Sequence, residues 1–376
     1  MAQLIASAGP ISAFLNEGIG DYLLITFNDA ADALKTDGRS FWGQALVEKN
    51  GVAAIGVVTT EKNWYAPSAM EEVAAKLKPT LARYSKVLCY GNSMGGYAAI
   101  RFSKLLGATH VLAIVPQAGI DPSVVTPFDR RYTTHFGKGG GGMIEPGHVA
   151  GKIWIVYDPL YSHDSGHAKL LKKAEPDARM IRVPLRGHGV IHLTKGSKST
   201  LNLFDAVFAD RYLDVVRMYR KRKRESWVYY YTMATAMVRR RPAEVLRLLK
   251  ADKRFSVPIA NRTQLIVAAN ARIGRRDEAL SAAIAYARMH PTDLKTPLKI
   301  LDSMLAYKAP EQASAFIDVL DQSGFQHPAF ERTRRLVEQG LRRAAVAVRV
   351  APFALAVEWL SALFDVLNSE FAASLL

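Results

Sequence analysis

The chain has 376 residues, of which 49% are apolar and 22% charged, as in an ordinary globular protein. This composition excludes a wholly disordered chain and a collagen, and the length favours two domains. The single cysteine, Cys89, excludes an intramolecular disulfide and a zinc site built from several cysteines. We expect a cytoplasmic protein, because the first residues do not resemble a secretory signal peptide and no charge-free apolar stretch reaches the roughly 18 residues of a membrane span.

The net charge of +16 is unevenly distributed along the chain. Residues 1–208 contain 22 Lys and Arg against 17 Asp and Glu, whereas residues 209–376 contain 28 against 17. Five consecutive basic residues occupy positions 220–224. Such a run attracts polyanions, but no nucleic-acid reading motif accompanies it. We therefore interpret it as a solvated face and expect no nucleic-acid partner.

Short apolar runs alternate with helical patterns over the first 200 residues. The runs that predict strands are 22–28, 51–60, 86–92, 110–117, 152–158 and 178–185, with helices predicted at 68–84 and 94–106. The runs are continuously apolar, which is typical of strands buried on both faces of a parallel sheet. Strand–helix–strand order predicts an α/β domain with a mostly parallel sheet.

A glycine-rich run at 137–142 interrupts this alternation. It lacks the preceding strand, the following helix and the Lys–Ser/Thr pair that a phosphate-binding loop needs. We interpret it as a flexible loop or lid.

Helical patterns without strand signals fill the chain from about residue 211. Segments 240–250, 274–284 and 308–318 align at an offset of 34 residues and place Val245, Ala279 and Ala313 in one column. This region resembles tetratricopeptide-type helical hairpins. We therefore expect an α/β domain at 1–208 and an all-α repeat domain at 209–376, closed by an apolar helix at 350–368. A helix lying on a membrane surface is the alternative for that last segment.

The clearest chemical signal is the sequence Gly91-Asn92-Ser93-Met94-Gly95, which has the form G-x-S-x-G. It directly follows a predicted strand and directly precedes a predicted helix, as in a nucleophile elbow. Such a turn holds the Ser93 hydroxyl at a helix N-terminus, where free N–H groups favour a developing negative charge. The N–H of Met94 is one expected oxyanion donor.

A serine hydroxyl needs a base, and the base in turn needs an orienting carboxylate. His188, between two glycines just past the last strand, is the expected base, and His192 is the alternative. Asp158 at the end of a strand is the preferred acid. Asp164 is the second candidate, and it also suits a helix N-cap.

Through "GNSMGG", the Asp that follows a strand and "RGHG", residues 20–208 resemble the α/β-hydrolase superfamily. The resemblance implies acyl chemistry with Ser93 as nucleophile, His188 as base and Asp158 or Asp164 as acid. It also implies a second oxyanion donor from the loop at 27–32, where the backbone of Asn28 or Asp29 is the candidate.

Two further groups of residues have more than one interpretation. Trp64 and Tyr65 follow a strand and could line the pocket, although packing residues are the commoner case. His163, Asp164 and His167 have a spacing that zinc ligands also show. Helix capping and the triad account for Asp164, so we expect no metal and no cofactor.

We therefore expect a serine hydrolase that acts on an ester, or an acyltransferase, with a small-molecule or glycan substrate. The alternative is an inactive hydrolase fold whose helical repeat mediates protein–protein interaction. The positive charge of the helical part favours an acidic protein partner.

Overall fold

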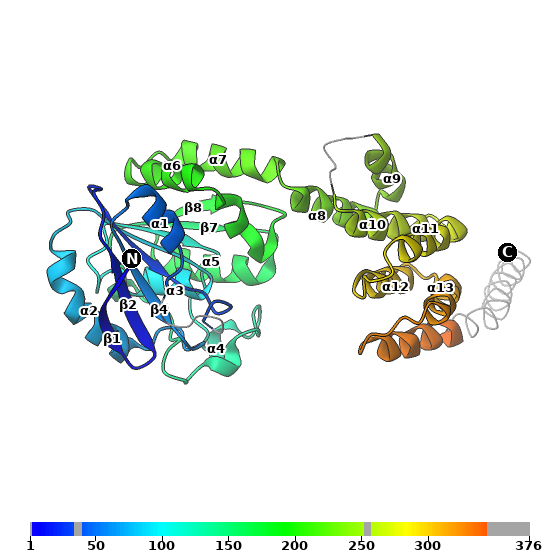
Figure 1. The fold of residues 1–376 in the computed structure, drawn as a ribbon, viewed down its shortest axis with the longest axis horizontal. Helices are drawn as coiled ribbons and strands as arrows, with labels where there is room; N and C mark the ends of the chain where they lie inside the picture. The colour runs from blue at the N-terminus through cyan, green and yellow to red at the C-terminus, as the bar shows by residue number, and fades with distance from the viewer. Residues whose placement is uncertain (1, 34–39, 252–256, 344–376) are drawn as a thin grey trace, which may run out of the picture. The chain divides into compact units, whose positions relative to one another are not determined.

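The computed structural model describes residues 2–33, 40–251 and 257–343 of the chain. It divides into two compact units, Met1–Tyr229 and Tyr230–Leu376 (Figure 1). Among the described residues, the strands lie in the first unit and the second unit is helical.

The first unit is built around one eight-stranded sheet with the order β1-β2-β4-β3-β5-β6-β7-β8. The strands are β1 (Gln3–Ala8), β2 (Ile11–Asn16), β3 (Leu23–Phe27), β4 (Ala54–Thr59), β5 (Val87–Asn92), β6 (His110–Ile114), β7 (Lys152–Tyr157) and β8 (Arg179–Arg182). Strands β3 to β8 pair in parallel, whereas β1 and β2 pair antiparallel with their neighbours. The prediction of a mostly parallel α/β sheet is confirmed.

Helices cover both faces of this sheet (Figure 1). They are α1 (Gln44–Asn50), α2 (Pro67–Leu81), α3 (Met94–Arg101), α4 (Pro122–Val125), α5 (Ser162–Ala174), α6 (Ser197–Phe208) and α7 (Tyr212–Arg224), with 3-10 segments η1 (Thr133–His135), η2 (Pro146–His148) and η3 (Gly187–Thr194). One apolar cluster joins α2, α3 and α5 to the sheet, and a second joins α1, η3, α6 and α7 to the opposite face.

Two features of the first unit differ from the sequence-based expectation. The hairpin of β1 and β2 was not predicted, although Gly9-Pro10 separates its two strands. The boundary between units falls after Tyr229 rather than after residue 208. The reason is that α7 belongs to the sheet: its Val215 and Tyr219 are buried in the cluster beneath β8 and η3.

The second unit is helical over most of its described residues. The helices include α8 (Trp227–Val238), which begins in the first unit, α9 (Pro242–Ala251), α10 (Ile259–Arg272), α11 (Arg276–Met289), α12 (Thr296–Ala306) and α13 (Pro310–Gln322), and residues 330–343 are also helical. Helices α9, α11 and α13 start at residues 242, 276 and 310, which keeps the 34-residue spacing seen in the sequence. Val245, Ala279 and Ala313 are each fully buried, so the aligned column is a column of packing residues.

The apolar segment 350–368 lies outside the described residues. Within the described residues, no helix has the length and apolar character that crossing a membrane requires.

Candidate active site

Ser93 lies at the turn between β5 and α3, in a backbone conformation that non-glycine residues rarely adopt, with φ 54° and ψ −118°. Its N–H donates to the carbonyl of Ile114 on β6, and its carbonyl accepts from the N–H of Tyr97 in α3. These two hydrogen bonds tie the strained residue to the neighbouring strand and to the helix. A positive φ at a non-glycine residue costs free energy that the surrounding structure must supply. The turn is therefore built to hold the Ser93 hydroxyl in place.

The glycines around Ser93 leave room for this turn. A Cβ added to Gly91 would lie 2.1 Å from the carbonyl oxygen of Gly95, and one added to Gly95 would lie 2.4 Å from the carbonyl oxygen of Phe27. Real Cβ atoms do not approach backbone so closely, so a side chain at either position would push β5, α3 or β3 apart. The G-x-S-x-G pattern is thus explained by contacts with backbone rather than by loop flexibility.

The Ser93 hydroxyl belongs to a chain of hydrogen bonds through His188 to a carboxylate. Oγ of Ser93 lies 2.9 Å from Nε2 of His188, and Nδ1 of the same ring lies 2.8 Å from Oδ1 of Asp164. Asp164 is buried, whereas the side chain of His188 is one-quarter exposed. With Nδ1 protonated, His188 presents an acceptor to the serine. This is the order nucleophile, base and acid that an activated serine requires.

The preference for Asp158 as the carboxylate beside His188 is corrected by this geometry. Oδ2 of Asp158 accepts hydrogen bonds from the backbone N–H groups of Arg186 and Gly187, both at 2.6 Å, and Oδ1 accepts from Leu160 at 2.9 Å. The buried Asp158 therefore fixes the course of the loop that carries His188. Asp164, in the first turn of α5, faces the imidazole instead.

Gln117 is a site residue that the sequence analysis missed. It follows β6, is fully buried, and places Nε2 3.0 Å from Oγ of Ser93. The hydroxyl carries one proton, which His188 accepts, so Gln117 must donate to the hydroxyl oxygen. Because β5 and β6 are parallel neighbours, a polar residue just past β6 lies at the same sheet edge as Ser93. That placement is the signal that could have revealed it.

The two expected oxyanion donors, Met94 and the loop at Asn28, both lie at the start of α3. Met94 is the first residue of α3, so its N–H has no acceptor within the helix. A Cβ on Gly95 would lie 3.0 Å from the carbonyl oxygen of Asn28, so the loop after β3 lies against the start of α3. The Asn28 amide exchanges hydrogen bonds with the backbone of Thr59, and the Tyr65 hydroxyl lies 2.8 Å from the Asn28 carbonyl oxygen. The loop is therefore held rigidly over the helix.

Tyr65 and Trp64 are both fully buried and both have a positive φ. Burial raises the pKa of the Tyr65 hydroxyl well above its usual value, so it remains a donor. The glycine run packs against this turn: a Cβ on Gly140 would lie 2.4 Å from the carbonyl oxygen of Asn63, and the Tyr97 hydroxyl donates to the carbonyl of Gly142. The run is thus anchored to buried backbone, in contrast to the loose loop expected from sequence.

A second group of buried charges lies behind Asp164. Asp129 accepts hydrogen bonds from Arg131 and His167, and Arg131 also lies 3.7 Å from Oδ1 of Asp164. Burial alone would raise the pKa of Asp129, but the hydrogen bonds from His167 and Arg131 outweigh it and hold the pKa far below the usual range. The anionic Asp129 fixes Arg131, which in turn places a positive charge beside Asp164.

The spacing of His163, Asp164 and His167 is explained without a metal. His163 contacts the carbonyl of Phe128, Asp164 contacts His188, and His167 bridges Asp129 and a backbone N–H. No group of three metal-ligating side chains was found in the described part of the chain. His192, the alternative base, lies on η3 and lines two neighbouring pockets. Burial and the nearby charges of Lys195 and Arg186 lower the pKa of its imidazole.

Comparisons with known proteins give structural neighbours but no family. No family model matches the chain, and no curated protein matches it. A capsule O-acetyltransferase of Neisseria meningitidis serogroup A is 13% identical, with a TM-score of 0.35, covering 49% of this chain and 88% of its own. The Pyrococcus furiosus esterase Pf2001 is 11% identical, with a TM-score of 0.37, and the match covers 53% of this chain and 88% of the esterase chain. Carboxyl esterase 2 of Tuber melanosporum is 15% identical, with a TM-score of 0.35, and the match covers 58% of this chain and 86% of the esterase chain.

Proposed function

We propose that the first unit is a serine hydrolase or acyltransferase of the α/β-hydrolase type. The observation that carries the proposal is the hydrogen-bonded chain Ser93–His188–Asp164, which starts at a strained turn at a helix N-terminus. A buried serine in ordinary packing would need neither the strained backbone nor an imidazole oriented by a buried carboxylate.

In the first half of the reaction Ser93 Oγ forms a bond to the acyl carbon of an ester, and its proton passes to Nε2 of His188. The carbonyl oxygen becomes an oxyanion, which accepts a hydrogen bond from the N–H of Met94 and from the loop at Asn28 and Asp29. The bond between the acyl carbon and the alcohol oxygen then breaks, and His188 donates its proton to the leaving alcohol. Asp164 stabilises the imidazolium in between and keeps the ring in its tautomer.

In the second half a hydroxyl group attacks the acyl-serine, and His188 takes its proton and returns it to Ser93. Water as the nucleophile gives a carboxylic acid, and a glycan hydroxyl gives a new ester. Both outcomes use the same residues, and we propose a glycan or another small hydroxylated molecule as the ester or the acceptor. Chromatography of the acid and of the acylated acceptor, after incubation with acetyl esters with and without the sugar acceptor, distinguishes hydrolysis from transfer.

The test of the activated serine is the intact mass after treatment with a fluorophosphonate. Ser93 Oγ would attack phosphorus and expel fluoride, leaving one phosphonyl group on the protein. We expect one adduct on the wild type and none on Ser93→Ala. The matched control is Ser68→Ala, since Ser68 is an exposed serine at the start of α2, and it should be labelled like the wild type. A folded wild type that takes no adduct would refute the proposal.

For the second unit we propose a tetratricopeptide-like array that binds an acidic segment of a partner protein. The supporting feature is a pocket of about 580 Å³ among α9, α10 and α11. Its lining combines apolar Leu246 and Ile266 with a set of basic side chains, Arg247, Lys250, Arg262 and Arg275, against the single carboxylate of Glu278. An acidic peptide with apolar side chains complements such a surface.

A fluorescent Glu- and Leu-containing peptide tests this partner proposal on the full chain. Arg275→Glu should weaken its binding and flatten the salt dependence, because the substitution reverses a charge in the pocket. Arg288→Glu is the control, since it reverses a charge on α11 outside the pocket. Equal binding by both variants would contradict the proposal. If the peptide binds while Ser93 takes no adduct, the inactive scaffold becomes the better description of the protein.

A further inference from the structure

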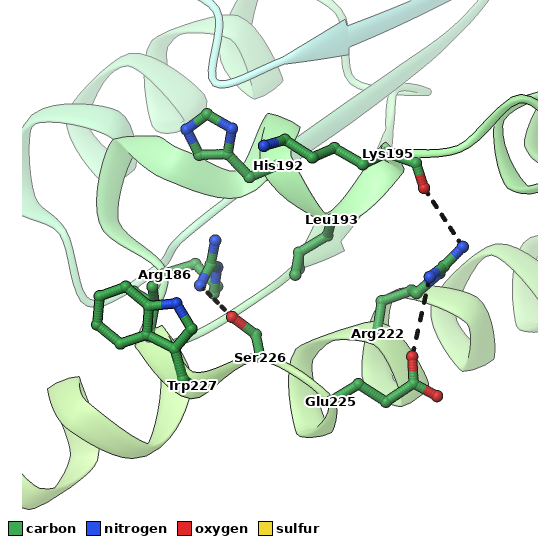
Figure 2. Close-up of a pocket in the computed structure, with 9 residues that line it drawn as sticks. Arg186, His192, Leu193, Lys195, Arg222, Glu225, Ser226 and Trp227 are labelled. Carbon is green, nitrogen blue, oxygen red and sulfur yellow. Dashed lines mark hydrogen bonds and ion pairs between the residues drawn. The ribbon is translucent and has the colours of Figure 1, made fainter. Parts of the chain in front are cut away.

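A basic pocket of about 400 Å³ lies beside the loop that carries His188 (Figure 2). All of its lining residues belong to the first unit: Arg186, His192, Leu193, Lys195, Arg222, Glu225, Ser226, Trp227 and Val228. They come from η3 and the residues on either side of it, from the C-terminal end of α7 and the two residues that follow it, and from the start of α8. No step of the proposed mechanism uses this pocket.

The charges that line the pocket are strongly unequal. Three permanent cations face the carboxylate of Glu225, which lies 3.9 Å from Arg222. Among the described residues, neither Arg186 nor Lys195 forms an ion pair with a carboxylate. Burial lowers the pKa of Arg186, and the attraction of Asp158 opposes that change only in part, since the Asp158 carboxylate also accepts three backbone N–H groups. The pocket therefore has an uncompensated positive charge.

Arg186 is the most informative of these residues, because an arginine is rarely buried without a carboxylate. It is 6% exposed. One terminal nitrogen donates to Oγ of Ser226 (Figure 2). The other donates to the carbonyl of Gly189. Its Nε is buried and has no hydrogen-bond partner within the described residues. Burial lowers the pKa of the guanidinium. An anion in the pocket would therefore offset the free-energy cost of burying this charge and of leaving its Nε without an acceptor.

The position of the pocket connects it with the proposed reaction. Arg186 precedes His188 by two residues, and its hydrogen bond to the carbonyl of Gly189 closes the short segment that contains His188. His192 and Lys195 also line a neighbouring pocket of about 410 Å³, which reaches Asp29 and Asn92. Asn92 is the residue before Ser93. The two pockets share His192 and Lys195, and the second reaches the residue next to the serine.

We propose that the pocket of Arg186, Lys195 and Arg222 binds an anionic group, a carboxylate or a phosphate, on the ester substrate or the acyl acceptor. This inference rests on the proposed function for its connection with acyl chemistry, and it narrows the substrate class to negatively charged hydroxylated molecules. Guanidinium groups match both anions, because each presents two oxygens to a planar pair of N–H donors.

The test compares aryl acetates that differ only in a remote substituent. 4-Carbamoylphenyl acetate is neutral, while the matching 4-carboxy and 4-phosphonooxy esters are anionic. We expect kcat/KM of the wild type to favour one or both anionic esters. Lys195→Met should lower that preference about threefold, within the range for exposed charge pairs. Lys195→Glu should lower it about tenfold, because it replaces an attraction by a repulsion of similar size. Lys198→Met and Lys198→Glu change an exposed lysine on α6 outside the pocket and should leave the preference as in the wild type.

A binding measurement without turnover separates this proposal from the proposed function. Calorimetric titration of Ser93→Ala with inorganic phosphate should show binding that Lys195→Glu weakens and Lys198→Glu leaves unchanged. If Ser93 takes no fluorophosphonate, the proposed function fails, and this titration still decides whether the pocket binds anions. If Ser93 reacts but Lys195→Glu changes neither the ester preference nor phosphate binding, the anion subsite is refuted.

Discussion

Two buried aspartates near His188 offer a matched pair of substitutions that separates a chemical role from a structural one. Asp164 contacts the imidazole at 2.8 Å, whereas Asp158 accepts three backbone N–H groups and does not contact the ring. Both are nearly inaccessible to solvent, at 1% and 2% exposure. Changing each to asparagine removes one negative charge and keeps the size of the side chain.

The two variants should fail in different ways. In Asp164→Asn an amide N–H₂ or a neutral oxygen faces Nδ1, so the ring loses its fixed tautomer and the stabilised cation, and reactivity should fall roughly 10³- to 10⁴-fold. Its stability should change little, because Oδ2 of Asp164 has no hydrogen-bond partner among the described residues. Asp158→Asn keeps one acceptor oxygen for three donors. Leaving one buried donor unpaired costs about 1–3 kcal/mol, or roughly 3–10 °C in Tm.

The assay is the rate of fluorophosphonate labelling measured beside thermal unfolding of the same preparations. We expect Asp164→Asn to be slow and stable, and Asp158→Asn to be less stable but to retain most of its labelling rate at a temperature where it is folded. If folded Asp158→Asn labels as slowly as Asp164→Asn, the assignment of the acid from the geometry is incorrect.

Three further predictions concern the surroundings of Ser93. Gln117→Leu removes the donor to the serine hydroxyl together with a buried, unpartnered Oε1, so labelling should slow about tenfold while the free energy of unfolding in urea stays equal or rises. Gly95→Ala places a Cβ 2.4 Å from a β3 carbonyl and should lower both Tm and labelling, whereas Gly142→Ala, with no atom within 4 Å, should do neither. Because the pKa of Asp129 is lower in the folded state than its usual value of 3.8, its ionised carboxylate stabilises the fold at pH values above 3.8, and this stabilisation is lost as the pH falls below 3.8. The free energy of unfolding in urea should therefore differ less between pH 3 and pH 6 in Asp129→Asn than in the wild type. An equal difference in the two proteins would contradict the ion-pair argument.

The sheet and the nucleophile turn could be predicted because their requirements are local. A strand buried on both faces needs a continuous apolar run, and the runs at 86–92 and 152–158 became β5 (Val87–Asn92) and β7 (Lys152–Tyr157). The turn at Ser93 needs glycine on each side because backbone passes within contact distance there. These requirements concern residues that are adjacent in the sequence, so a single sequence is enough to recognise them.

The domain boundary could not be predicted from local patterns. The pattern of an amphipathic helix indicates that one face is buried, but it does not indicate which element packs against that face. Helix α7 has the same pattern as the helices that follow it, yet Val215 and Tyr219 are buried against the sheet. The 34-residue spacing was a better guide, since it compares segments with one another. It identified the starts of α9, α11 and α13, and it gave no sign that α7 belongs to the array.

The acid and Gln117 were harder to predict because their roles depend on segments distant in sequence. Asp158 and Asp164 both follow β7, and the expectation that the acid lies at the end of a strand favours Asp158. The loop from β8 to η3 decides between them: it needs an acceptor for the N–H groups of Arg186 and Gly187, and the nearer aspartate supplies it. Asp164, in the first turn of α5, is therefore the aspartate that faces His188. A polar residue at the carboxyl end of a parallel strand is therefore a site candidate, and its role follows from which backbone donors the adjoining loops leave unpaired.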